Sequence, residues 1–515
     1  MQDQPAPTAE GYVSISLTAP EASQRLLREC STSRMVHVTR LLAIDGIDVN
    51  VRDAKGRPAL VVAASHGVDA VVTALIEAGA SVNQATPDGT SAAFAAASKG
   101  HADALKALVK AGCDVDQTRS DGATPAYAAA SSGHGEALDL LLEAGCDLDR
   151  AVPGKGATPL LAAAFNGRAR VARALLQAGA DPNKCAADGT SPLIVAAWHG
   201  DAAVARALLD VGADASKVRP QDGATALFLA AQSNHVPVVE LLLERGRADP
   251  SLPGGQCRAT PLIIASERGH VASVRTLLNA GADPNTSDGT GWTACHAACQ
   301  NGHLAALNAL LQARADPNAR CRPDGCTPAL IAAQQNHAGC LDALASKGAD
   351  LDAAYLTGHC STPMIMAAHN DASDAARALA SKGADVRKTN ARGASSVAVA
   401  AALGHADVLK VLLRVDPRGA QTVDSDGAAP LHVAAARGRT SSVAALLRAG
   451  APADATWRGL TPIEIARRNG HGHVVRLLAT RAIDAGAKAT EVTPDDATRD
   501  LGSPCVPAGH VVPPL

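Results

Sequence analysis

The chain has 515 residues, of which 47% are hydrophobic and only 2% aromatic, and its 47 Lys and Arg against 50 Asp and Glu give a formal net charge of −3. The charges are dispersed, so the sequence offers no basic field for a phosphate backbone, and nucleic acid is not expected as a partner. Large globular cores usually rely on aromatic side chains, so this composition favours thin layers of small side chains instead.

Residues 1–20 lack a basic start followed by an apolar core, and no apolar run reaches bilayer-spanning length. The 12 cysteines, from Cys30 to Cys505, are too scattered for the disulfide framework of a small secreted domain. We therefore expect a soluble monomer with reduced thiols, in the cytoplasm or the nucleus, without membrane insertion. Residues 1–20 and the mostly polar segment 482–515 are expected to be disordered.

In chain order, the first predicted element is a polar capping helix over residues 22–30, within a degenerate N-terminal capping repeat that spans 21–52. From residue 53 to 481 one phrase then returns about every 33 residues, which predicts an array of about thirteen repeats. The phrase is Asp-Gly, one small residue, Thr or Ser, and Pro, as at 121–125, 188–192 and 324–328.

Each repeat predicts two short helices. Asp-Gly makes a turn, Thr158 can cap the helix that follows, and Pro159 fits its first turn, while Gly167 can end that helix in a left-handed conformation. Apolar residues at helical spacing, such as Val171 and Leu175, give the second helix one buried stripe. A lone pair cannot bury this stripe, so the fold class is an all-α solenoid of stacked helix-turn-helix units joined by β-turn loops.

This pattern resembles the ankyrin repeat. Residues 426–435 (DGAAPLHVAA) carry a nearly complete first half of the family signature, and Gly269-His270 with residues 281–285 (GADPN) carry the later half. The resemblance implies a protein interaction scaffold or adaptor that binds partners on a concave face. Three stretches depart from the signature: 253–255 lengthens one connection, Asp371-Ala372 replaces Gly-His, and 393–419 lacks both the Thr-Pro start and the glycine stop, which predicts a weak or kinked link.

Several groups that could carry chemistry are better explained by the repeat. His101, His134, His270, His303, His405 and His471 follow a glycine at the same place in their repeats, so we interpret them as structural. Cys295, His296 and Cys299 fall on core positions, and Cys113 and Cys146 are one repeat apart, beyond disulfide reach. Residues 154–158 (GKGAT) lack the spacing of a phosphate-binding loop. We therefore predict no catalytic residue, no metal and no cofactor.

The resemblance places the turn tips and the end of each first helix on the binding face. Phe94, Tyr127 and Phe228 occupy a packed position and are expected in the core, whereas Phe165 and Trp198 share an outward one in consecutive repeats. The predicted partner-binding residues are Phe165, Trp198, His199, Gln232, Glu267, Arg268, Trp292, Gln300, Gln334 and His369. Phe165 and Trp198, with Trp292 farther along, are predicted to anchor the partner.

Three functions stay open at this point: a protein-binding scaffold, the substrate-recognition arm of a larger assembly such as a ubiquitin ligase, and an enzyme. The second would need a recruiting box, and residues 482–515 contain no such motif. The third would need a catalytic domain, and no segment outside the repeats is long enough to form one. The resemblance also implies that Asn183, Asn285 and Asn318 could be substrates of an asparaginyl hydroxylase, the alternative being that each Asn only satisfies turn backbone.

Overall fold

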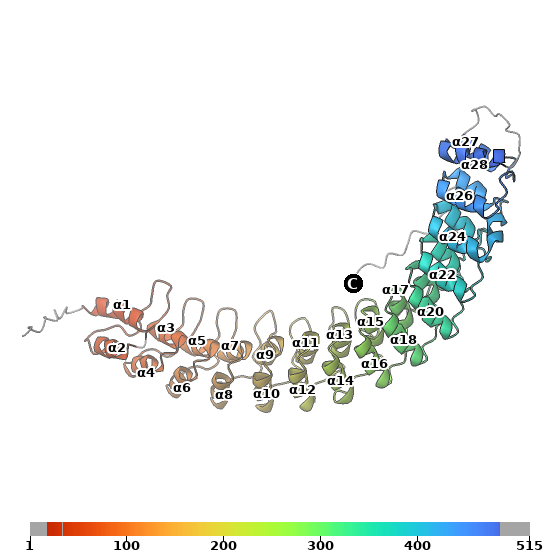
Figure 1. Ribbon diagram of the computed structural model, residues 1–515. Coiled ribbons are helices and arrows are strands. Elements are labelled where there is room, and N and C mark those ends of the chain that lie inside the picture. The colour runs from red at the N-terminus through yellow and green to blue at the C-terminus, as the bar shows by residue number, and fades with distance from the viewer. Residues whose placement is uncertain (1–17, 33, 485–515) are drawn as a thin grey trace, which may run out of the picture. The chain divides into compact units, whose positions relative to one another are not determined.

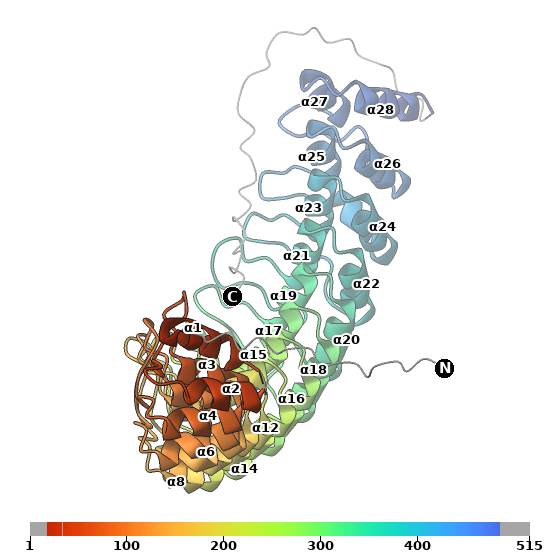
Figure 2. The same cartoon turned by 90° about the vertical axis from the view of Figure 1, so that its left-hand side faces the viewer.

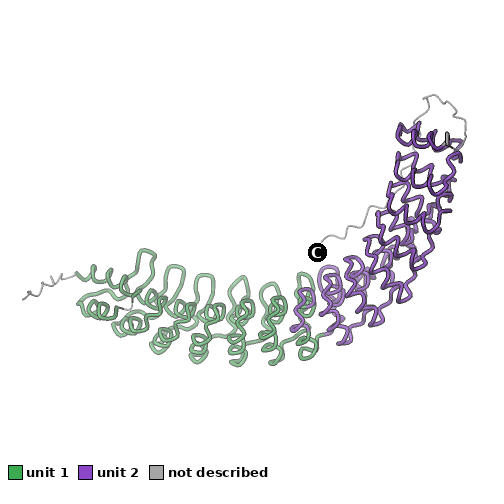
Figure 3. Tube along the Cα trace, in the orientation of Figure 1, with its two compact units in different colours: residues 1–230, 240–248 green, residues 231–239, 249–515 purple. Residues whose placement is uncertain are grey.

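The computed structural model describes residues 18–32 and 34–484, so the predicted disordered segments 1–20 and 482–515 lie largely outside the described residues. The chain divides into two compact units (Figure 3), residues 1–230 with 240–248 and residues 231–239 with 249–515. Within the described residues the elements are helices, and extended backbone is limited to isolated bridges in the loops, such as Val152 with Ala157. None of the described helices is both long enough and apolar enough to cross a bilayer.

Unit 1 contains six helix pairs, in which an odd-numbered helix comes first and an even-numbered helix second. Their bounds are α1 (Ala19–Glu29), α2 (Met35–Leu42), α3 (Ala59–His66), α4 (Asp69–Glu77), α5 (Ala92–Lys99), α6 (Ala102–Lys110), α7 (Pro125–Ser132), α8 (Gly135–Glu143), α9 (Pro159–Phe165), α10 (Ala169–Gln177), α11 (Pro192–His199) and α12 (Ala202–Asp210). The first helices form one row and the second helices another (Figure 1). The division between the units passes through α13 (Ala226–Gln232) and α14 (Val236–Glu244).

Unit 2 continues the same alternation. Its helices are α15 (Pro261–Glu267), α16 (Val271–Asn279), α17 (Ala294–Gln300), α18 (Leu304–Gln312), α19 (Pro328–Gln334), α20 (Ala338–Ser346), α21 (Pro363–His369), α22 (Ser373–Ser381), α23 (Ser396–Leu403), α24 (Ala406–Val415), the 3-10 helix η1 (Pro417–Gln421), α25 (Pro430–Ala436), α26 (Thr440–Arg448), α27 (Pro462–Arg468) and α28 (Gly472–Asp484). Figure 2 shows the odd-numbered helices of this unit in one column and the even-numbered helices in the next.

The helix starts follow the predicted chemistry. The side chain of Thr158 accepts a hydrogen bond from the backbone N–H of Leu161 at 3.2 Å, and Pro159 occupies the first turn of α9. Ser191 caps α11 in the same way through the N–H of Ile194, also at 3.2 Å. Each of these caps satisfies a backbone donor that the helix start leaves open, so α9 and α11 begin where the repeat predicts.

The core consists of the small and branched side chains that the composition predicts. In α9, Leu160, Ala163 and Ala164 are fully buried, and α10 meets them with Leu175. Phe94 and Phe228 are buried as expected, whereas Tyr127 is half-buried. Because alanine lets neighbouring helices approach closely, consecutive first helices stack along the row and bury a continuous apolar layer.

Where the sequence departs from the repeat signature, local interactions take the place of the missing residues. Asp371 adopts a φ of 55° in the position that a glycine takes elsewhere. In the stretch predicted to be weak or kinked, Ser395 still caps α23 through the N–H of Ala398 at 3.2 Å. The glycine stop after α24 is replaced by η1, whose cap, Asp416, accepts the N–H of Arg418 at 3.1 Å and forms an ion pair with Arg387 at 2.6 Å. The helix start there is ordinary, and the irregularity is confined to the turn.

Candidate partner-binding face

The candidate face is built from one repeated position, seven residues after the cap of each first helix, which we call the outward slot. The helix cap fixes the phase of the helix, so the same side of every first helix carries this slot. Its occupants are Ser65, Ser98, Ser131, Phe165, Trp198, Gln232, Glu267, Gln300, Gln334, His369, Ala402, Ala436 and Arg468. Only two of them are aromatic, and they lie in neighbouring repeats of unit 1.

Phe165 and Trp198 are exposed by 58% and 49%, which confirms that neither belongs to the core. His199 lies between them. Its ring meets that of Phe165 edge-on at a centroid distance of 5.0 Å and stacks on that of Trp198 at 5.5 Å. The three rings, here called the aromatic cluster, therefore form one continuous aromatic surface across two repeats, with favourable ring geometries of this kind worth about 1 kcal/mol each.

A hairpin loop contributes a cation to the same place. The guanidinium of Arg219, in the loop before α13, lies 5.9 Å from the centre of the Trp198 ring. Asp222 holds Arg219 with two hydrogen bonds of 2.5 and 3.0 Å, and these bonds lower the pKa of Asp222 and raise the pKa of Arg219. The stacked cation supports Trp198 from one side and joins the loop tip to the end of the first helix.

The remaining slot residues with predicted roles lie in unit 2 and are polar. Gln232, Glu267, Gln300, Gln334 and His369 are half-buried, and Arg268 beside Glu267 is exposed. Burial raises the pKa of Glu267, against the opposing effect of the Arg268 charge. Burial, together with the nearby His405, lowers the pKa of His369. These side chains offer hydrogen-bonding groups rather than apolar area.

Trp292 differs from the two exposed aromatics. It lies in a hairpin loop of unit 2, and its ring stacks on the buried ring of His296 at 5.1 Å. Its backbone N–H donates to the carboxylate of Asp288 at 3.0 Å. Trp292 is consequently half-buried, and much of its surface packs against its own repeat.

The groups weighed for chemistry take up structural positions. Cys295, His296 and Cys299 are buried, and the two ring nitrogens of His296 contact Thr293 and the carbonyl oxygen of Cys326, the latter at 3.1 Å. Burial lowers the pKa of His296 to about 4, so the ring is neutral at pH 7. The eleven cysteines in the described ranges are free thiols, and the described residues hold no group of three or more potential metal ligands. Residues 154–158 form a hairpin turn, in which the N–H of Gly156 donates to Val152 at 2.8 Å.

The repeated histidines and asparagines bind the neighbouring repeat. Nε2 of His101 lies 3.3 Å from the carbonyl oxygen of Ser65, and His471 makes the equivalent 3.0 Å contact with Ala436. The side-chain oxygens of Asn183, Asn285 and Asn318 accept the backbone N–H of Asp214, Asp316 and Asp350 at 2.7–2.8 Å. Each Asn therefore satisfies turn backbone in the next repeat, while hydroxylation of these residues stays a prediction.

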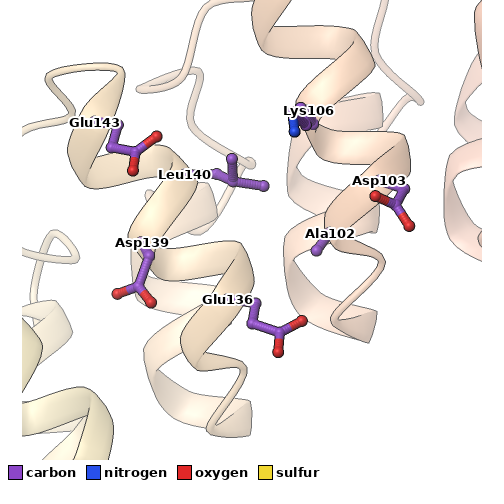
Figure 4. Close-up of a pocket in the computed structure, with 7 residues that line it drawn as sticks. All are labelled: Ala102, Asp103, Lys106, Glu136, Asp139, Leu140 and Glu143. Atoms are coloured by element: carbon purple, nitrogen blue, oxygen red, sulfur yellow. The ribbon is translucent and has the colours of Figure 1, made fainter.

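One hollow lies on the opposite, second-helix side of unit 1. It runs between α6 and α8, and Figure 4 shows Asp103 and Lys106 on one wall and Glu136, Asp139 and Glu143 on the other. The walls are largely carboxylates at a shallow, open surface. This arrangement supplies no nucleophile with an adjacent base, so it carries no catalytic interpretation.

Two contributions to the face were missed by reasoning from the sequence. His199 was predicted only as one of the partner-binding residues, yet it lies between the two aromatic rings. Arg219 was not considered, although it is the cation over Trp198. Its position in a turn tip gave a signal, but the contact joins residues 21 apart through two repeats and depends on the packing of the loops.

Capped helix pairs stacked in rows, with contacts only between neighbours and an outward slot that varies from repeat to repeat, define a repeat protein of the solenoid class. The family model described as ankyrin repeats (3 copies) matches residues 27–119, 94–185, 178–253, 247–321, 296–390 and 397–489. The chain therefore belongs to the ankyrin-repeat family, whose members generally mediate protein–protein interactions.

A solved structure gives a partial likeness. The crystal structure of the human ASB11 ankyrin repeat domain is 30% identical, covers 40% of this chain and 90% of that chain, and superposes with a TM-score of 0.37. No curated protein gave a significant match to the sequence.

Proposed function

We propose that this protein is a non-catalytic scaffold or adaptor that binds partner proteins on the face formed by its hairpin loops and first-helix ends. The observation that carries this proposal is the aromatic cluster. The sequence contains only three Phe, three Tyr and three Trp, yet Phe165 and Trp198 each leave about half of their surface in solvent. Exposed aromatic rings that adjoin one another are favoured anchors of protein interfaces.

The polar slot residues of unit 2 complement this anchor. Gln300 and Gln334 present amides from consecutive first helices, and Glu267 with Arg268 presents a pair of opposite charges. Groups of this kind add little net affinity, but they select the partner and fix its register through hydrogen bonds. In this proposal the aromatic cluster of unit 1 anchors the partner, and the polar slot residues of unit 2 determine which partner is bound.

The test compares two sets of variants with a partner purified from cells. Phe165→Ala with Trp198→Ala removes the anchor, and both side chains are exposed, so the melting temperature should change little. Truncation of a true hot spot costs about 2 kcal/mol or more, so affinity should fall about thirtyfold. The matched control is Val211→Ala, which removes exposed apolar area at the end of α12, on the second-helix side.

Unchanged affinity in the folded double variant would contradict the proposed anchor. Co-purification of ubiquitin-ligase subunits with the wild-type chain would instead favour a substrate-recognition arm. We also propose a location in the cytoplasm or the nucleus, which the free thiols of the described cysteines support. A tagged chain found in an oxidising compartment would contradict that location.

A further inference from the structure

Arginines gather where the last two first helices of unit 2 end. Arg437 caps the C-terminus of α25, Arg439 begins α26, and Arg468 is the final residue of α27. Arg468 occupies the outward slot of its repeat, and Arg437 follows that slot in the preceding one. All three therefore belong to the side of the unit that carries the first-helix ends.

Hydrogen bonds between the two repeats bring these arginines to one place. The carbonyl oxygen of Ala436 accepts Nδ2 of Asn469 at 2.8 Å and lies 3.0 Å from Nε2 of His471. Asn469, which follows Arg468, therefore contacts Ala436, which precedes Arg437. The Nε of Arg439 donates to the carbonyl oxygen of Ala402 at 3.4 Å, which fixes its stem beside the preceding repeat.

Positive charge exceeds negative charge at this place. Arg437 is half-buried, and both burial and the charge of Arg439 lower its pKa. Among the side chains of residues 18–32 and 34–481, no carboxylate forms an ion pair with Arg437, Arg439 or Arg468. The nearby Glu464 accepts hydrogen bonds from the N–H and the hydroxyl of Thr461, both at 2.7 Å, and these bonds, with smaller contributions from the charges of Arg468 and Arg467, lower its pKa.

The equivalent place in an earlier repeat carries an acid beside the arginine. Arg268 holds the position that corresponds to Arg437, and there the outward slot is Glu267, whose pKa burial raises while the Arg268 charge opposes that rise. In the later repeat the slot is Ala436, so Arg437 faces a like charge with no acid beside it. A partly desolvated guanidinium in this state is stabilised by an added carboxylate.

We propose that Arg437, Arg439 and Arg468 form a binding site for an acidic peptide segment of a partner protein. Guanidinium groups bind carboxylates through paired hydrogen bonds, and arginines from adjacent repeats suit carboxylates spaced along an extended peptide. Nucleic acid is disfavoured because single strands need exposed rings for stacking. The one aromatic residue within 405–481, Trp457, is half-buried, donates Nε1–H to the carbonyl of Asp426 at 2.9 Å and is covered by Arg458. This site is separate from the aromatic cluster of unit 1.

The experiment measures fluorescence anisotropy of a labelled peptide, in which Glu alternates with Gly, on addition of the full-length protein. Binding should weaken as salt is raised, because exposed charges are screened. Arg437→Gln with Arg468→Gln should lower the affinity about tenfold, which corresponds to about 1.4 kcal/mol. The matched control, Arg414→Gln with Arg448→Gln, makes the same charge change at exposed residues of the second helices α24 and α26 and should leave the affinity nearly unchanged.

A second measurement needs no ligand. Because Arg437 has no carboxylate partner and a like-charged neighbour, Arg437→Gln should not lower the melting temperature. A clear decrease would show that the arginine serves the fold and would count against the site. The proposal is also overturned if the corresponding Gln-Gly peptide binds equally well, if the control pair loses as much affinity, or if a single-stranded oligonucleotide displaces the acidic peptide at lower concentration. The variant that lacks Phe165 and Trp198 should bind the acidic peptide normally, which separates this test from that of the aromatic anchor.

Discussion

Gly269 and His303 lie so close that a Cβ atom on residue 269 would approach Nδ1 of His303 to 2.6 Å. Gly269 ends the first helix of its repeat with a φ of 71°, and His303 begins the second helix of the next. A Cβ atom on Gly67 would likewise clash with the ring of His101, and one on Gly302 with the ring of His337. The Gly-His pair of the repeat is therefore a contact between repeats, in which the absent side chain of one residue makes room for the ring of another.

Gly269→Ala should destabilise unit 2 through two effects. A left-handed backbone costs an ordinary residue about 1 kcal/mol, and displacement of the His303 ring should add about 1 kcal/mol more. Gly281→Ala is the matched control, because Gly281 has a φ of 89° and a Cβ there would meet nothing within 4 Å. Urea unfolding should place the Gly269 variant below the Gly281 variant. Equal midpoints would mean that the ring moves aside without cost.

Asn285→Ala should cost about 1 kcal/mol, because it removes the acceptor for the backbone N–H of Asp316 at 2.7 Å. Asn285→Asp should be nearly neutral, since Asp116 accepts the N–H of Asp147 at 3.0 Å in an equivalent position. Thermal unfolding of the two variants checks the difference. If the Asp variant lost as much stability as the Ala variant, the side-chain oxygen would not be the important group.

His296 should make stability depend on pH. Its folded-state pKa of about 4 lies below the ordinary value of 6.5, so the unfolded chain binds a proton more readily between these values. Its contribution is fully present above about pH 6.5 and is lost as the pH falls toward 4. For a buried ring this corresponds to about 2 kcal/mol between pH 7 and 5.

His296→Leu tests this assignment, because Leu161 and Leu330 occupy the equivalent position in other repeats. The variant should lose stability less steeply than the wild type when urea unfolding is measured from pH 7 to pH 5. Parallel profiles for the two proteins would assign the pH dependence to other groups.

Arg387→Gln should lower the melting temperature and destabilise the turn at η1, because it leaves the largely buried carboxylate of Asp416 without its ion pair. The Arg387 hydrogen bond also holds the pKa of Asp416 below its usual value, so this stabilisation is present near neutral pH and is lost in acid. Lys388→Gln is the control, because Lys388 pairs with Asp352 only at 3.7 Å. Equal melting temperatures of the two variants would contradict a role for Asp416 in replacing the glycine stop.

Much of the fold could be predicted because the same turn, cap and core residues recur in each repeat. Thr158 and Ser191 predict helix starts through local hydrogen bonding, which involves only neighbours within one turn of helix. Phe165 and Trp198 were placed outward because the resemblance to the ankyrin repeat assigns the end of each first helix to the binding face.

The parts that were not predicted depend on how side chains pack between and within repeats. The edge-on contact of His199 with Phe165, and the position of Arg219 over Trp198, each join two repeats. Trp292 is half-buried because His296, four residues later, offers its ring as a platform. The family pattern gives the position of a turn-tip residue but not the direction in which its side chain packs.

Some of the bonds between repeats join a donor of the later repeat to an acceptor of the earlier one, although others, such as Arg320 to the carbonyl oxygen of Ala354, run the opposite way. The N–H of Asp316 donates back to Asn285, the N–H of Ser81 donates back to Asn50, and the ring of His471 reaches back to Ala436. In the contacts of Asp316, Ser81 and His471, the acceptor belongs to the earlier repeat and the group that reaches it belongs to the later repeat. During synthesis the ribosome delivers the chain in this order, so each emerging repeat finds its template already folded. The array can therefore form repeat by repeat during translation, with each new repeat docking on the one before it.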